Sequence, residues 1–188
     1  MTKTVLFVQG AGEGAYAADQ LLADSLQASL GDDYEVIYPP VENEDDPDYD
    51  VWKAQITGIL DRLDSDSEVI LAGHSFGGSL LLKALGDARL KETLHPRTKG
   101  VFLVATPYWG ADDFWKAEEY ELPDDIAARI PASVPIYLYH CRDDEMVPFS
   151  HLAMIAQHLP QAFIRIWESG GHQCDNDLSR VAADITRL

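Results

Sequence analysis

Ser75 occupies the centre of the pentapeptide Gly73-His74-Ser75-Phe76-Gly77, which follows an apolar run and precedes an apolar segment of helical character. A serine held on a sharp turn from strand to helix adopts strained backbone angles, and side chains two positions away on either side would collide. Glycine at positions 73 and 77 removes that conflict, and the following helix directs its positive end toward the turn. The pattern therefore predicts a nucleophilic serine whose oxyanion accepts a hydrogen bond from the amide of Phe76.

A serine nucleophile needs a base, and the base needs a carboxylate that fixes its tautomer. Asp143 and Asp144 follow one apolar run, and His172 follows the next, directly after two glycines. The order serine, acid, histidine is the order that this type of site requires. We predict His172 as the general base and Asp144 as its orienting acid, with Asp143 as the alternative acid. The other histidines are expected to have no catalytic role. His74 should pack beside the elbow, His140 should lie within its strand, and loop or helix positions are expected for His95, His151 and His158.

The segment after the first apolar run, residues 9–14, is expected to supply the second oxyanion donor. Its glycines let the backbone approach a substrate closely, and the amide of Ala11 is the first candidate, with Gly12 next. The same loop offers a rival interpretation, because Gly10, Gly12 and Ala15 fit the glycine pattern of dinucleotide-binding enzymes. That pattern also needs an acidic residue at the end of the second strand, where this chain has Tyr38 followed by two prolines. The dinucleotide alternative is therefore disfavoured.

Six short apolar runs, rich in β-branched and aromatic residues, are predicted to be strands. They cover residues 5–8, 35–38, 69–72, 101–105, 134–139 and 163–167. The segments between them have helical spacing, as in the stripes Leu22-Leu26-Leu30 and Leu178-Val181-Ala182-Ile185. Alternating strands and helices predict an α/β fold: a three-layer sandwich with a predominantly parallel six-stranded sheet in one domain over residues 1–188. Residues 106–131 interrupt the alternation and are expected to form a small cap.

Composition limits the classes of partner. The net charge of −18 argues against nucleic acids and anionic membrane surfaces, which attract basic proteins. Apolar runs of membrane-spanning length are missing, and the N-terminal residues predict a strand rather than a signal peptide, so a cytoplasmic location is expected. The acidic run over residues 42–48 is interpreted as a solvated surface loop. Cys141 and Cys174 are interpreted as free thiols without zinc-ligand spacing.

Taken together, the elbow around Ser75, the segment Asp144-Glu145-Met146-Val147-Pro148 and the closing Gly170-Gly171-His172 resemble the α/β-hydrolase superfamily. The short chain is similar to the minimal serine hydrolases related to retinoblastoma-binding protein 9 and YdeN, a trimmed form of that fold with a short cap insertion. In the family pattern the acid lies four residues before the proline of the Val-Pro pair, which corresponds to Asp144. Gln9 departs from the pattern, because many relatives have histidine before this glycine.

The expected activity is that of a carboxylesterase-like serine hydrolase, which forms an acyl-enzyme on Ser75 and requires no metal or organic cofactor. Thioesters and amides are alternative small-molecule acyl substrates. A second alternative is a non-catalytic, protein-binding member of the same fold. Substrate contacts are expected from Gly10, Gly12, Trp109 and Met146. Aromatic residues near the strand ends that could line the pocket are Tyr16, Phe76, Tyr108, Trp109, Phe114, Trp115 and Phe149.

Overall fold

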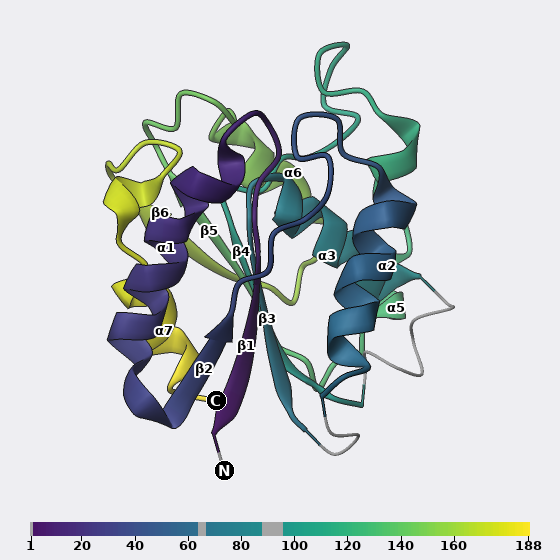
Figure 1. The fold of residues 1–188 in the computed structure, drawn as a ribbon. Coiled ribbons are helices and arrows are strands. Elements are labelled where there is room, and N and C mark those ends of the chain that lie inside the picture. The colour runs from purple at the N-terminus through teal and green to yellow at the C-terminus, as the bar shows by residue number, and fades with distance from the viewer. Residues whose placement is uncertain (1, 64–66, 88–95) are drawn as a thin grey trace.

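Six parallel strands form the centre of the molecule, in the order β2-β1-β3-β4-β5-β6 (Figure 1). The computed structural model describes residues 2–63, 67–87 and 96–188, so the expectation for His95 lies outside the described residues. The strands are β1 (Lys3–Val8), β2 (Tyr34–Ile37), β3 (Val69–His74), β4 (Thr98–Val104), β5 (Ile136–Cys141) and β6 (Phe163–Trp167). All six predicted strands are present, and the predicted three-layer α/β architecture is confirmed.

Helices cover both faces of the sheet (Figure 1). One face packs against α1 (Ala15–Leu30) and α7 (Ser179–Ile185), and the other against α2 (Tyr49–Leu60), α3 (Phe76–Gly86) and α6 (Ser150–His158). Side chains along each strand alternate between the two layers: in β1, Leu6 belongs to the α2–α3 side and Phe7 to the α1–α7 side. Both side chains are fully buried, which explains why the sequences of the strands are continuously apolar.

The strand order reverses direction at β1. From β1 the chain moves to β2 on one side, and then returns to place β3 on the other side of β1. Loops after β1 and β3 therefore diverge at the same point of the sheet, and in open α/β sheets ligands bind at such a point. Val8 pairs with Gly73 in the β1–β3 register, so residues 9–14 and the Ser75 turn leave the sheet side by side.

Residues 106–131, between β4 and β5, contain only a short 3-10 turn (Glu118–Tyr120) and the single-turn helix α5 (Ile126–Arg129). Tyr120, Ile126 and Ile130 are buried in the α2–α3 layer, which ties this segment to the body of the domain. No helix within the described ranges is long and apolar enough to span a membrane.

The close packing of α3 on β1 depends on Gly77. A Cβ atom at this position would collide with the backbone carbonyl oxygens of Val8 and Gln9, and a Cβ at Gly73 would lie 2.8 Å from the backbone of Gly77 and Gly78. Backbone atoms cannot move aside as a flexible side chain can. The two glycines of the Ser75 pentapeptide are therefore required by sterics between β1, β3 and α3.

We expect Gly77→Ala to destabilise the fold by about 3 kcal/mol, at the upper end of the usual cost of overpacking. The matched control is Gly58→Ala in α2, where an added Cβ meets no atom within 4 Å. That change should stabilise the protein by about 0.5–1 kcal/mol, because alanine loses less conformational entropy in a helix. Urea denaturation measures both, and equal stability of the two variants would contradict the steric argument.

Candidate active site

Ser75 lies at the turn between β3 and α3 with φ 51° and ψ −123°, a backbone conformation that non-glycine residues rarely adopt. Such a conformation costs about 1–3 kcal/mol and persists only where surrounding contacts enforce it. The amide of Ser75 donates to the carbonyl of Val104 on β4 at 2.8 Å, and its carbonyl accepts from Gly78 at 3.0 Å. Phe76 is the first residue of α3, so its amide belongs to the helical turn that has no intrahelical acceptor.

His172 follows β6 and is hydrogen-bonded to Asp144, which follows β5. The Nδ1 atom of His172 lies 3.1 Å and 3.0 Å from the two carboxylate oxygens of Asp144. A proton on Nδ1 leaves the lone pair on Nε2, the tautomer that a general base needs. Asp143 instead accepts from the amides of Gly170 and Gly171 at 3.3 Å and 3.0 Å, and Glu145 accepts from the amide of His172 at 3.0 Å.

The Asp144 carboxylate is fully buried and has several hydrogen-bond donors. Besides His172 it accepts from the amides of Met146 and Val147, at 2.9 Å and 2.8 Å, and lies 3.1 Å from Nε2 of His140. Burial acts to raise the pKa of Asp144, but the hydrogen bonds from His140 and His172 outweigh it, and the pKa falls well below its usual range. His140, which we expected to lie within a strand without a catalytic role, therefore helps to keep Asp144 ionised.

The loop after β1 is held by neighbouring side chains. Gly10 donates its amide to Asp19 at 2.7 Å, and Gly12 donates to the carbonyl of Glu44. The amides on both sides of Ala11 are thus already engaged. Gln9 is fully buried; its Nε2 donates to Glu44 at 2.9 Å and its Oε1 accepts from the amide of Val41 at 3.3 Å. The glutamine that departs from the family pattern therefore supports this loop.

Most of the acidic run over residues 42–48 is exposed, as expected for a solvated loop, but Glu44 also has a structural role. Its carboxylate accepts from the amides of Gly14 and Tyr16 at 2.9 Å and 2.7 Å, at the N-terminus of α1. A carboxylate at this place is stabilised by the helix dipole. It also occupies the position in which a dinucleotide enzyme would bind pyrophosphate, which removes the physical basis of the dinucleotide alternative.

His74 and Asp19 form an ion pair directly beneath Ser75. The distance from His74 Nδ1 to Asp19 Oδ2 is 2.9 Å, and the two side chains are only 2% and 1% exposed. The Nε2 atom of His74 lies 2.9 Å from the backbone carbonyl oxygen of His172. Packing beside the elbow was the expected role of His74, and Asp19 was not considered as a site residue.

A cavity of about 640 Å³ opens over these groups. It is lined by Ser75, Phe76, His172 and Ala11, and by all four of the expected substrate contacts: Gly10, Gly12, Trp109 and Met146. Of the aromatic candidates, Phe76, Trp109 and Trp115 line the cavity, but Tyr16, Tyr108, Phe114 and Phe149 do not. Phe114 is 83% exposed, and Tyr16 stacks on Tyr38. Tyr120, which the sequence analysis missed, completes the aromatic wall through edge contacts with Phe76 at 4.8 Å between ring centroids.

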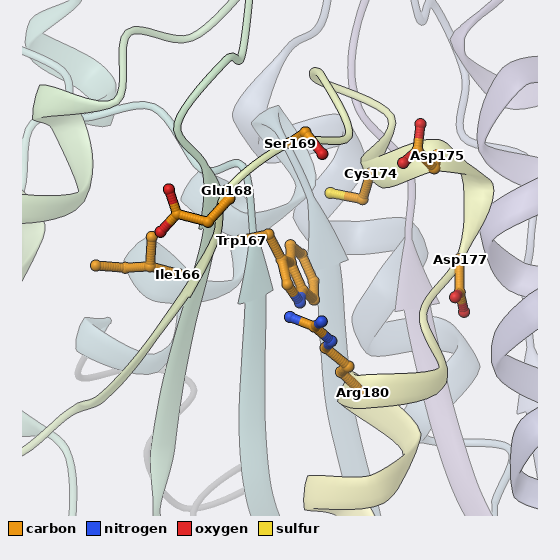
Figure 2. A pocket seen from close by; sticks show the side chains of 8 residues that line it. All are labelled: Ile166, Trp167, Glu168, Ser169, Cys174, Asp175, Asp177 and Arg180. Atoms are coloured by element: carbon orange, nitrogen blue, oxygen red, sulfur yellow. The ribbon is translucent and has the colours of Figure 1, made fainter.

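A second pocket lies against the end of β6 (Figure 2). It holds about 310 Å³ and is lined by Ile166, Trp167, Glu168, Ser169, Cys174, Asp175, Asp177 and Arg180. Neither Ser75 nor His172 lines it. The thiols of Cys141 and Cys174 are both buried and unbridged, with their sulfur atoms 3.7 Å apart.

Comparison with solved structures confirms the fold. A serine hydrolase from the polyaromatic-hydrocarbon-degrading bacterium Cycloclasticus zankles superimposes with a TM-score of 0.74 at 15% identity, covering 100% of this chain and 89% of that one. The ydeN gene product of B. subtilis gives 0.66 at 19% identity and covers 99% and 98%. An esterase from Exiguobacterium antarcticum gives 0.69 at 14% identity and covers 98% and 91%.

No curated protein matches the chain in sequence. A family model described as serine hydrolase, however, matches residues 26–183, a range that contains Ser75, Asp144 and His172. At identities below 20% the solved structures show a shared α/β-hydrolase fold, and the family match covers most of the sequence. The chain belongs to the serine hydrolase family.

Proposed function

We propose that this protein hydrolyses carboxylic esters by two-step acyl transfer through an acyl-enzyme on Ser75. The observation that carries the proposal is one cavity that is lined by a serine in a strained turn and by a histidine bonded to a buried carboxylate. That combination matches the requirements of an activated nucleophile.

In the first step, Nε2 of His172 accepts the proton of Ser75 as the Oγ atom attacks the substrate carbonyl carbon. The amides of Phe76 and Ala11 donate to the oxyanion, and Ala11 is favoured over Gly12 because the Gly12 amide already donates to Glu44. Asp144 stabilises the imidazolium and holds its orientation, and His172 then protonates the departing alcohol. In the second step His172 activates a water molecule, which releases the carboxylic acid and restores Ser75.

The cavity walls favour an apolar acyl or alcohol group of moderate size. Trp109, Trp115 and Tyr120 form one side with Phe76, and the volume lies within the usual range for small-molecule sites. Met146, which is 63% exposed, lies at the rim. We therefore expect short-chain or aromatic esters to be turned over faster than long-chain ones, with thioesters as a related class. The esterase from Exiguobacterium antarcticum has the same fold, which is compatible with this class of substrate.

Ser75→Ala should lower kcat for p-nitrophenyl acetate by about a millionfold, since it removes the nucleophile. The wild-type protein should also form a single covalent adduct with a fluorophosphonate probe, detected by intact-protein mass spectrometry, and the variant should form none. Ser169→Ala, in the second pocket of Figure 2, is the control and should label and turn over like wild type. A loss below about tenfold in Ser75→Ala would refute the assignment. A folded wild type that neither labels nor hydrolyses any ester would instead favour the non-catalytic binding protein.

The two adjacent aspartates allow a matched test of the acid. Asp144→Asn should reduce kcat by about 10⁴-fold, because an amide cannot hold His172 in the required tautomer. Asp143→Asn keeps one of the two oxygens that accept from the Gly170 and Gly171 amides. Because Asp143 is bonded to these amides and not to the His172 ring, the change should reduce kcat by less than about tenfold. Steady-state kinetics on one ester compare the two variants. The reverse order of effects would reassign the acid to Asp143.

A further inference from the structure

The buried pair of His74 and Asp19 takes no part in the proton transfers described above. His74 is nevertheless adjacent to Ser75 in the sequence and contacts the backbone of His172. Asp19 comes from the second turn of α1, and His74 is the last residue of β3, next to Ser75. A charged pair that is almost fully removed from water is costly unless both groups are saturated with hydrogen bonds. The contacts of this pair satisfy that condition and also define its protonation state.

Both ring nitrogens of His74 have partners that only accept hydrogen bonds. Nδ1 lies 2.9 Å from the Asp19 carboxylate, and Nε2 lies 2.9 Å from the carbonyl oxygen of His172. A backbone carbonyl and an ionised carboxylate cannot donate, so with Asp19 ionised each nitrogen carries a hydrogen and the ring is a buried imidazolium. A neutral ring would place one lone pair against an oxygen lone pair.

The same pair holds three loops of the site. Asp19 Oδ2 accepts from the Gly10 amide at 2.7 Å, and Asp19 Oδ1 accepts from Gln173 Nε2 at 3.1 Å. His74 binds the carbonyl of His172. The loop carrying Ala11, the Ser75 turn and the loop carrying His172 are thus joined through one carboxylate and one imidazolium.

We infer that His74 and Asp19 are positioning residues for the acyl transfer, and that their ion pair fixes the oxyanion loop and the His172 backbone relative to Ser75. This inference rests on the proposed function of the site. Neither residue touches the reacting atoms; each acts through the loops that it binds. Misplacement of catalytic groups by about 1 Å can cost about 100-fold in rate, so the pair has a measurable catalytic effect.

The charges around the pair support a stable cation at His74. Burial lowers the pKa of His74, but the charge and hydrogen bond of Asp19, the His172 carbonyl and the charge of Asp144 outweigh it, so the pKa is raised. For Asp19, burial raises the pKa, and the contacts with His74, Gly10 and Gln173 more than reverse this effect. The other ionisable groups that face the pair are the His172 ring, 4.6 Å from the His74 ring between centroids, and Glu44 and Tyr38 near Asp19.

The protonation state is tested on the wild-type protein by ¹⁵N NMR of the histidine rings, assigned through bonds to the His74 backbone. We expect two protonated nitrogens at His74 at pH 7.5, with ring hydrogens that exchange slowly with water. One unprotonated nitrogen at that pH would overturn the inference. This measurement needs no variant and no activity.

The positioning role is tested with Asp19→Asn. The carboxamide has the shape of the carboxylate, and the Gln173 amide can turn to meet it, because Gln173 Oε1 is buried without a hydrogen-bond partner. Without the negative charge His74 becomes neutral and loses one of its two hydrogen bonds. We expect kcat to fall by about 10- to 100-fold, with KM changed by less than about threefold. Asp24→Asn, at an exposed site on the same helix, is the control and should leave kcat unchanged.

A third measurement, the pH dependence of protein stability, tests the ion pair independently of the acyl transfer. The contribution of Asp19 to stability is fully present above its ordinary pKa of 3.8, and that of His74 is fully present below its ordinary pKa of 6.5. The fall in Tm caused by Asp19→Asn should therefore be largest between these two pH values, and should shrink as the pH rises through the raised pKa of His74.

The outcomes are distinct. A wild type that neither labels nor hydrolyses esters, but has a doubly protonated His74, refutes the proposed function and leaves the ion pair established. An active Asp19→Asn variant with wild-type kcat and a neutral His74 refutes the positioning role. A rise in KM that matches the fall in kcat would also refute it, because the pair would then serve substrate binding.

Discussion

The contact between the Gly77 backbone and the end of β1 is the constraint on which the site depends. Because α3 begins against the carbonyls of Val8 and Gln9, Ser75 must turn sharply out of β3 with a positive φ. The same contact brings the loop after β1 beside the first turn of α3, so that two sets of backbone amides face one cavity. A larger residue at Gly77 would separate them. Steric exclusion at one residue thus determines both the direction in which Ser75 leaves β3 and its distance from the loop after β1.

Carboxylates perform most of the remaining positioning. Asp144 is hydrogen-bonded to the His172 ring, and Glu145 accepts from the His172 amide. Asp143 accepts from the amides of Gly170 and Gly171. Glu44 and Asp19 hold the loop after β1. Loops have few backbone partners of their own, and a carboxylate accepts several amide hydrogen bonds at once. Part of the excess negative charge of this protein is therefore structural, and it stabilises loops at the carboxyl ends of the strands.

Local patterns predicted the strands and the sharp turn at Ser75, because both depend on neighbouring residues. Apolar runs reflect burial on two faces, and the glycines around Ser75 reflect a clash within five residues. Asp19 could not be predicted in this way, since its side-chain partners His74 and Gln173 are 55 and 154 residues away and it lies in an ordinary amphipathic helix. Glu44 was hidden among six other residues of an acidic run, and Tyr120 lay in a segment without periodicity. Such residues are defined by tertiary contacts, which leave no trace in local sequence.

The bond between Asp19 and Gln173 also has a consequence for synthesis of the protein. It joins the first helix to the last loop before α7, so this part of the site forms only after nearly the whole chain has left the ribosome. Parallel sheets built from distant segments fold slowly compared with helical bundles, because loop closure precedes the contacts that stabilise it. At about 5–20 residues per second, synthesis of the C-terminal half takes several seconds, during which the N-terminal half lacks the segments that it packs against. The contact between α1 and the loop after β6 therefore forms late, once the C-terminal segments have docked.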